Sequence, residues 1–287
     1  MSGNGYVSGL VGKMMREFFD PGKSLTRELG EECPAINVVV TVGPGKDSRK
    51  VRDAHIYLKQ QEYKGPKRII TVFNGNDRAY HDSKAWDEVA PDISLYSREP
   101  LEYAGAVNAG IKEAEKYGGL TVLNDGDTCF TDSQILSKIA KKMKDPKCAG
   151  GVLQVTPAPE YSGLPGIKQF YGWNTFWADY TSRLANIPLI GGLFPATANG
   201  MLFFRAGYRL RMDEGLKNMN DVYLLDDIRK RGKTEFLRTD GVQTAGDRYE
   251  SNILKAWADK FQNGNKKLQG KKEEMAPLSI LGEPAIA

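Results

Sequence analysis

The sequence has few of the residues that build several common kinds of site. It contains two histidines, His55 and His81, and three cysteines among 287 residues. Two histidines exclude a histidine-rich zinc site. Three scattered cysteines argue against a disulfide framework and for a reducing compartment, so we expect a cytoplasmic protein. The longest apolar region, residues 187–204, is interrupted by prolines and glycines, and we therefore expect no membrane-spanning helix.

The overall composition is that of an ordinary globular protein. Hydrophobic residues make up 40% of the chain and charged residues 26%. These values exclude wholesale disorder and collagen-like repeats. The formal net charge of +4 suits ligands that carry phosphate, but it is too small to indicate a nucleic-acid partner by itself.

Apolar segments alternate with amphipathic ones in the first half of the chain. Strands are predicted at residues 36–42, 68–73 and 120–123, and each ends in a loop rich in glycine, asparagine or aspartate. Helices are predicted at residues 48–62, 101–117 and 132–144. This alternation is typical of an α/β fold with a mainly parallel sheet flanked by helices. Because ligands gather at the carboxyl ends of such strands, we expect a nucleotide site among these loops.

The same pattern suggests how the chain is divided. We expect an N-terminal extension over residues 1–34, one catalytic domain over 35–250, and a C-terminal helix with a basic tail over 251–287. Within the domain, a nucleotide-binding half would cover about 35–130 and an acceptor half about 149–250. Aromatic residues gather in the second half: Phe170, Tyr171, Trp173, Phe176, Trp177 and Tyr180. Four of them would stack on a sugar ring or pack in the core or a lid: Tyr171, Trp173, Trp177 and Tyr180.

The triplet Asp125-Gly126-Asp127 directly follows the third predicted strand. Two carboxylates separated by one glycine can both face a divalent cation that is bound to a diphosphate. Such hard oxygen ligands suit Mg²⁺ or Mn²⁺, which keep phosphates and waters among their ligands. The alternative interpretation is an Asx-type turn that ends the strand.

Two further segments are candidates for function. A helix is predicted to begin at Asn220, a favourable N-cap, and to end at Gly232. Asp221 at its start either complements the helix dipole or acts as a general base. Small residues from Gly105 to Gly110 would let a helix approach the sheet or a ligand closely.

Together, the ordered segments VVVTVGPG, RIITVFNGND, GAVNAGIKEA, TVLNDGD and NDVYLLDDIRKRG resemble the GT-A glycosyltransferases, in particular the inverting family-2 group. The resemblance implies transfer of a sugar from a nucleotide-diphosphate sugar to an acceptor hydroxyl. It implies that Asp125 and Asp127 hold Mn²⁺ or Mg²⁺, and that Asp221 deprotonates the acceptor. It also implies donor-binding roles for Thr41, Gly43, Asn74, Asp77, Asn108, Asp125 and Gly200.

Several positions depart from the family pattern. Phe73-Asn74 stands where an acidic residue is usual, Val107 replaces an arginine, and Asn220 replaces the acid before Asp221. No histidine follows His81, and Gln243 or Thr244 occupies the region of a histidine that often completes the metal site. The third metal ligand is therefore left open.

Other functions also fit parts of the sequence. A sugar nucleotidyltransferase would use a glycine-rich loop such as Gly43-Pro44-Gly45-Lys46. A nucleotide-sugar-binding protein without activity is the other alternative, and it would explain why the late histidine is missing and why Asn220 replaces an acid. For a transferase, a glycan is the favoured acceptor. A hydroxymethylated DNA base, which must be extruded from the duplex, and a polyprenyl-linked glycan are the alternatives.

Overall fold

The computed structural model describes residues 33–161, 167–186, 201–215 and 220–244. These residues belong to one compact unit that ends at Ala245. Among the described helices, none is both long and apolar enough to cross a membrane.

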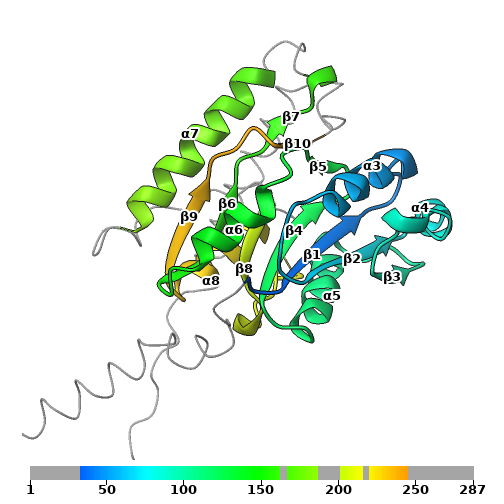
Figure 1. The fold of residues 1–287 in the computed structure, drawn as a ribbon, viewed down its shortest axis with the longest axis horizontal. Coiled ribbons are helices and arrows are strands. Elements are labelled where there is room, and N and C mark those ends of the chain that lie inside the picture. Colours follow the sequence, from blue (N-terminus) through cyan, green and yellow to red (C-terminus); the bar gives the residue numbers. More distant parts are fainter. Residues whose placement is uncertain (1–32, 162–166, 187–200, 216–219, 245–287) are drawn as a thin grey trace, which may run out of the picture. The chain divides into compact units, whose positions relative to one another are not determined.

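The centre of the fold is a seven-stranded sheet in the order β3-β2-β1-β4-β8-β6-β9 (Figure 1). The strands are β1 (Ile36–Val42), β2 (Lys67–Asn74), β3 (Ile93–Ser97), β4 (Leu120–Asp125), β6 (Cys148–Leu153), β8 (Leu202–Arg205) and β9 (Lys233–Leu237). Neighbouring strands are parallel except at β8, which is antiparallel to both β4 and β6. The carboxyl ends of β2, β1 and β4 therefore lie side by side at one edge.

Helices cover both faces of the sheet. They are α3 (Ser48–Lys59), α4 (Asp77–Ser83), α5 (Tyr103–Glu115), α6 (Ile135–Met143), α7 (Ile167–Ala185) and α8 (Asn220–Arg229). Short 3₁₀ turns lie at η1 (Asp87–Val89), η2 (Pro159–Tyr161) and η4 (Ala206–Tyr208). Apolar side chains of α3, α4 and α6 share one core cluster, and those of α5 and α8 share the other. This layering confirms the predicted α/β class.

The strands predicted from apolar runs are confirmed. All seven residues of β1 are buried, as expected for a parallel strand covered on both faces, which reads as a continuous β-branched run. The predicted helices at residues 48–62, 101–117 and 132–144 are each a few residues shorter in the structure. The first of these, α3, ends at Lys59, and Gln61 just beyond it bonds through its side chain to another part of the chain.

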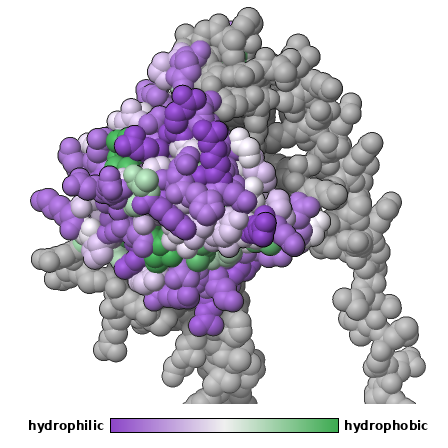
Figure 2. Space-filling model, turned by 90° about the vertical axis from the view of Figure 1, so that its right-hand side faces the viewer, coloured by the Kyte–Doolittle hydropathy of each residue, from purple (hydrophilic) through white to green (hydrophobic). Residues whose placement is uncertain are grey.

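The sequence did not indicate α4 or β3. Asn76 caps α4 by accepting a hydrogen bond from the amide of Ala79 at 3.0 Å. β3 is an edge strand in which half-buried and exposed residues alternate. The face of the molecule nearest β3 and α4 is mostly hydrophilic, with only small separate hydrophobic areas (Figure 2).

The small residues of α5 serve close packing against the sheet. A Cβ atom added at Gly110 would lie 2.2 Å from Cγ1 of Val39, which leaves no room for any side chain. At Gly105 the nearest atom would be 3.5 Å away, an ordinary contact distance. Of the two interpretations of this glycine-rich face, packing therefore explains Gly110.

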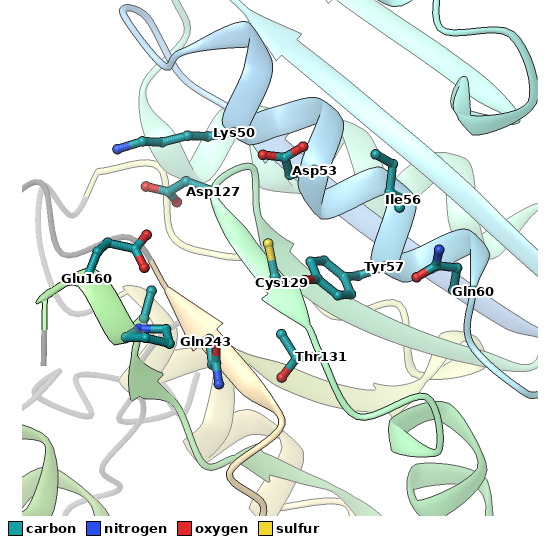
Figure 3. A pocket seen from close by; sticks show the side chains of 12 residues that line it. Lys50, Asp53, Ile56, Tyr57, Gln60, Asp127, Cys129, Thr131, Glu160 and Gln243 are labelled. Atoms are coloured by element: carbon teal, nitrogen blue, oxygen red, sulfur yellow. The ribbon is translucent and has the colours of Figure 1, made fainter.

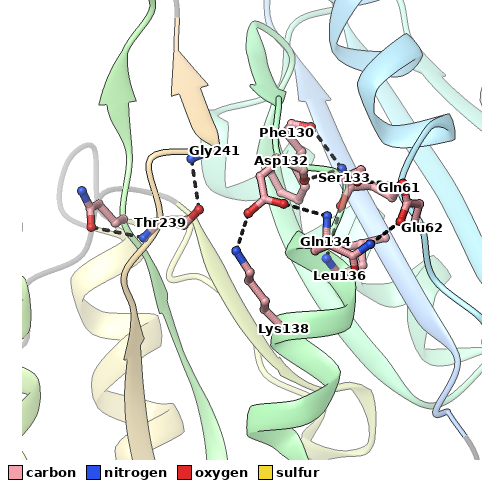
Figure 4. Close-up of polar contacts among 11 residues, drawn as sticks. Gln61, Glu62, Phe130, Asp132, Ser133, Gln134, Leu136, Lys138, Thr239 and Gly241 are labelled. Carbon is pink, nitrogen blue, oxygen red and sulfur yellow. Dashed lines mark hydrogen bonds and ion pairs between the residues drawn. The ribbon is translucent and has the colours of Figure 1, made fainter.

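A second sheet of three short strands follows β4. It contains β5 (Thr128–Phe130), β10 (Val242–Thr244) and β7 (Thr156–Pro157), in the order β5-β10-β7. Gln61, which is buried, joins the end of α3 to this sheet by donating to the carbonyls of Phe130 at 3.0 Å and Asp132 at 2.9 Å (Figure 4). Its side-chain oxygen accepts from the amide of Leu136 at the start of α6. One amide side chain thus fixes the position of the small sheet relative to α3.

Candidate active site

The loops after β1, β2 and β4 meet at the carboxyl edge of the sheet. The register places Thr41 beside Val72 of β2 on one side and Asp125 of β4 on the other. The amide of Gly126 donates to the carbonyl of Thr41 at 2.9 Å. The predicted convergence of these strand ends is therefore confirmed, and the triplet Asp125-Gly126-Asp127 lies directly against β1.

Asp127 is buried and forms an ion pair with the ammonium group of Lys46, which is 81 residues earlier in the chain. The main chain around Lys46 is held by Asn76, whose amide donates to the carbonyls of Gly43 at 3.0 Å and Lys46 at 3.1 Å. Gly45 has a φ of +73°, a conformation that favours glycine. The conformation of the Gly43–Lys46 loop therefore places the ammonium group of Lys46 beside Asp127.

Asp125 is half-buried at the last position of β4, and the hydroxyl of Tyr103 lies 3.4 Å from its Oδ1. Gly126 separates the two carboxylates. A Cβ atom there would lie 2.9 Å from Cγ2 of Val42 and 3.1 Å from the carbonyl oxygen of Thr41, so a side chain would push the turn away from β1. The glycine keeps both aspartates close to the strand ends.

Two residues predicted to contact the donor are engaged with neighbouring loops. Asn74 donates to the carbonyl of Leu101 at 2.9 Å and accepts from its amide at 2.7 Å. Asn108 makes the same pair of bonds with the main chain of Met212. Both amides fix loops at this edge of the sheet, while their contact with a donor stays a prediction.

The remaining predicted site residues take different positions. The carboxylate of Asp77, at the start of α4, accepts a hydrogen bond from the hydroxyl of Tyr96. Thr41 is buried, and Gly43 is half-buried in the loop that Asn76 holds. Gly200 lies outside the described residues.

Asp221 is the second residue of α8 and is half-buried. At the other end of this helix, Ile228 packs close to Gly150 near the beginning of β6. Since β6 runs parallel to β4, α8 runs back along the sheet with its first turn directed toward the carboxyl edge. Leu224, Leu225 and Ile228 are buried, which confirms the predicted apolar stripe of this helix.

The described residues contain no cluster of three or more His, Cys, Asp or Glu side chains that would hold a metal ion. Gln243 and Thr244 stand where the family that the sequence resembles often has a histidine. Thr244 pairs with Thr128, the residue after Asp127, and Gln243 pairs with Cys129. The end of β10 therefore lies beside the Asp125–Asp127 turn, as expected for the region that often supplies a further ligand.

The aromatic residues of the second half lie on α7. Trp173, Phe176 and Tyr180 are 49%, 54% and 43% exposed, and the rings of Phe176 and Tyr180 stack at 5.9 Å between centroids. The side chains of Phe170 and Trp177 lie outside the described part of the structure. For these three residues, exposure argues against a role in the core, whereas Tyr171 on the same helix is half-buried and packs against the core.

The sequence did not indicate two features of this region. One is the ion pair between Lys46 and Asp127. The other is a cavity of about 630 Å³ between α3 and the small sheet, with Asp127 in its wall (Figure 3). The ion pair could have been predicted, because Lys46 ends the glycine-rich loop after β1. This loop lies beside the loop after β4 when β1 and β4 are parallel neighbours.

The fold is shared with solved structures of low sequence identity. The mannosyltransferase PcManGT from Pyrobaculum calidifontis, solved with GDP-Man and Mn²⁺, is 14% identical, with a TM-score of 0.58 over 88% of this chain and 71% of that one. TarS 1–349 from S. aureus, solved with UDP, is 12% identical, with a TM-score of 0.55 over 74% of this chain. The same TarS fragment with UDP-GlcNAc is 11% identical, with a TM-score of 0.53.

These likenesses confirm the predicted GT-A fold. The chain spans 60% of the length of the TarS fragment solved with UDP. No protein-family model matches the chain, and no curated protein matches its sequence. Similarity to solved structures therefore establishes the fold alone, and the evidence for an activity lies in the residues of the site.

Proposed function

We propose that the protein is a glycosyltransferase that moves a sugar from a nucleotide-diphosphate sugar to an acceptor hydroxyl. The observation that supports this most is the turn after β4, where Asp125 and buried Asp127 lie against β1 and Lys46 reaches Asp127. In an α/β sheet this edge is where ligands bind. A mannosyltransferase of the same fold was solved with GDP-Man and Mn²⁺.

The carboxylates of Asp125 and Asp127 suit Mn²⁺ or Mg²⁺ as ligands, because these ions take one or two carboxylates together with substrate phosphates and water. When bound, such an ion stabilises negative charge on the departing diphosphate. Asp127 already has a cationic partner in Lys46. Lys46 would therefore have to release Asp127, and its ammonium group would then be available to the diphosphate oxygens.

Asp221 is proposed as the general base. Its carboxylate would take the proton of the acceptor hydroxyl while that oxygen forms a bond to the anomeric carbon. The bond from this carbon to the diphosphate oxygen breaks, and the nucleoside diphosphate leaves with the electron pair. A single displacement of this kind inverts the anomeric configuration. The start of α8 favours the ionised carboxylate that the step requires.

A donor screen tests the proposal. The protein is incubated with UDP- and GDP-linked sugars and Mn²⁺ or Mg²⁺, and release of nucleoside diphosphate and thermal stabilisation are measured. We expect at least one donor to stabilise the protein and to be turned over, and Asp125→Ala to abolish turnover. Asp82→Ala, a change at an exposed carboxylate of α4, is the matched control and should retain it.

Two results would overturn the proposal in different ways. Turnover of a nucleoside triphosphate with a sugar phosphate, and of no nucleotide sugar, would identify a nucleotidyltransferase. Stabilisation by a nucleotide sugar that is never turned over, with any acceptor or with water, would identify a binding protein on the same fold.

A further inference from the structure

The cavity between α3 and the small sheet has the volume of a small-molecule site, about 630 Å³. Its walls come from separate parts of the chain: α3, β5, η2 and β10 (Figure 3). Asp127 is in its wall, so the cavity adjoins the turn that we propose for the donor diphosphate. Neither the sequence motifs nor the proposed donor site assigns a ligand to this space.

Hydrogen bonds between separate parts of the chain hold the walls formed by α3, β5 and β10 together. Gln61, at the end of α3, bonds to the main chain of Phe130 in β5 and of Asp132 just after it. The amide of Asp132 donates in turn to the carbonyl of Gly241, just before β10. A Cβ atom at Gly241 would lie 2.1 Å from the Cβ of Asp132, so these two segments are in close contact. The protein itself therefore holds these walls in place, and a rigid wall lowers the cost of binding a ligand.

The side chains that face the cavity combine one aromatic ring with amides and carboxylates. Tyr57 is 36% exposed at the cavity surface, and Gln60 and Gln243 contribute amides. Among the described lining residues, Asp127 is already paired with Lys46, and the carboxylates of Asp53 and Glu160 outnumber the one ammonium group, that of Lys50. Amides and carboxylates bond well to hydroxyl groups. An aromatic ring offers an apolar face with a polar tip.

This balance of charge separates possible ligands. A nucleic acid carries one phosphate per nucleotide and needs lysines and arginines along its path. A cavity in which carboxylates outnumber the cation repels such a polyanion. A saccharide has no charge to repel, presents many hydroxyls, and has apolar faces that pack on an aromatic ring.

The cavity is suited to binding rather than to covalent chemistry. Cys129 is the thiol in its wall, and burial raises the pKa of that thiol to about 12. The thiol is therefore protonated at neutral pH and is a poor nucleophile.

We propose that this cavity is a saccharide-binding subsite that holds a neutral sugar unit of the acceptor, with Tyr57 as its stacking surface. That the saccharide is the acceptor rests on the proposed function, whereas saccharide binding in the cavity does not. A glycan acceptor is thereby favoured over DNA, because Asp53 and Glu160 outnumber Lys50 in the cavity wall.

The test is saturation-transfer NMR with the full chain and the methyl glycosides of glucose, galactose, mannose and N-acetylglucosamine as probes. We expect transfer to at least one glycoside and a loss of about tenfold in affinity in Tyr57→Ala, since ring stacking contributes about this much. Tyr57→Trp should retain binding. Tyr117→Ala is the matched control, because Tyr117 has a similar exposure of 40% and lies just beyond α5. It should leave binding unchanged.

Other outcomes would overturn this assignment. Binding of no glycoside, or binding that Tyr57→Ala and Gln243→Ala leave unchanged, would show that the cavity is not a saccharide subsite. Binding of a single-stranded DNA oligonucleotide that Tyr57→Ala weakens would show that the cavity takes nucleic acid instead. Donor stabilisation is measured in Tyr57→Ala as well and should not change. A failure of the donor site is thus distinguishable from a failure of the cavity assignment.

Discussion

Two sets of polar side chains lie toward the carboxyl edge of the sheet, and they differ in the kind of group to which they bond. The amides of Asn74, Asn76 and Asn108 bond to main-chain groups of neighbouring loops. The carboxylates of Asp125 and Asp127 contact the side chains of Tyr103 and Lys46. A main-chain partner is fixed by the fold, whereas a side-chain partner can change its rotamer when a ligand arrives. We therefore expect the amides to hold the loops of the candidate site in place, and the carboxylates to contact the ligand.

The largest expected effect concerns the carboxylate of Asp221. Asp221→Asn should lower turnover about a thousandfold, because a positioned general base contributes about this much. Donor affinity and the free energy of unfolding should stay close to those of the wild type. Asp227→Asn is the matched control on the same helix, since Asp227 pairs with Lys230 and is half-exposed. Equal turnover of Asp221→Asn and Asp227→Asn would remove Asp221 from the reaction.

The next effect concerns His55, a polar residue buried away from the edge. Burial lowers the pKa of His55 to about 4 from its ordinary value of 6.5. The unfolded chain therefore takes up a proton between pH 6.5 and pH 4 that the folded protein does not. The free energy of unfolding should fall by about 3 kcal/mol as the pH drops through this window, and be unaffected by His55 above it.

Urea unfolding of the wild type and of His55→Gln at pH 7.5 and pH 4.5 measures this dependence. The variant has no group that titrates at this position, while its amide can still bond to Thr71, whose hydroxyl lies 3.1 Å from Nε2 of His55. The wild type should lose more stability than the variant on acidification. The same loss in both proteins would mean that other groups cause the acid sensitivity.

A smaller effect tests whether the amide of Asn74 has the structural role assigned to it. Asn74→Ala removes two bonds to the main chain of Leu101 and should lower the free energy of unfolding by about 2 kcal/mol. Asp77→Asn changes a nearby exposed side chain and should cost less than about 0.5 kcal/mol. Nucleotide affinity that falls in Asn74→Ala while stability is retained would contradict the comparison and make Asn74 a donor ligand.

Much of the nucleotide-binding half could be predicted from the sequence. β1 is recognisable because a strand buried on both faces is a continuous β-branched run, and α5 because its buried residues recur every three or four positions. β3 was not predicted because it is a five-residue edge strand in which half-buried residues alternate with exposed ones, and this gives a weak pattern.

The chemistry of the site was harder to predict than its location. Asp125 and Asp127 follow from a short motif, but the partner of Asp127 depends on a lysine 81 residues away. The cavity depends on side chains from α3, β5, η2 and β10, which only the folded chain brings together. Local patterns report local structure, so contacts between distant loops are visible only when the strand order is known.

The central claim is that the Asp125–Asp127 turn binds the diphosphate of a nucleotide. Calorimetric titration of the nucleoside diphosphate identified by the donor screen, into the wild type and into Asp127→Asn with and without Mn²⁺, tests it most directly. We expect the wild type to bind with Mn²⁺, and the affinity to fall about tenfold or more when either Mn²⁺ or the Asp127 carboxylate is removed. Equal affinity in all four titrations would contradict the claim and place the nucleotide elsewhere.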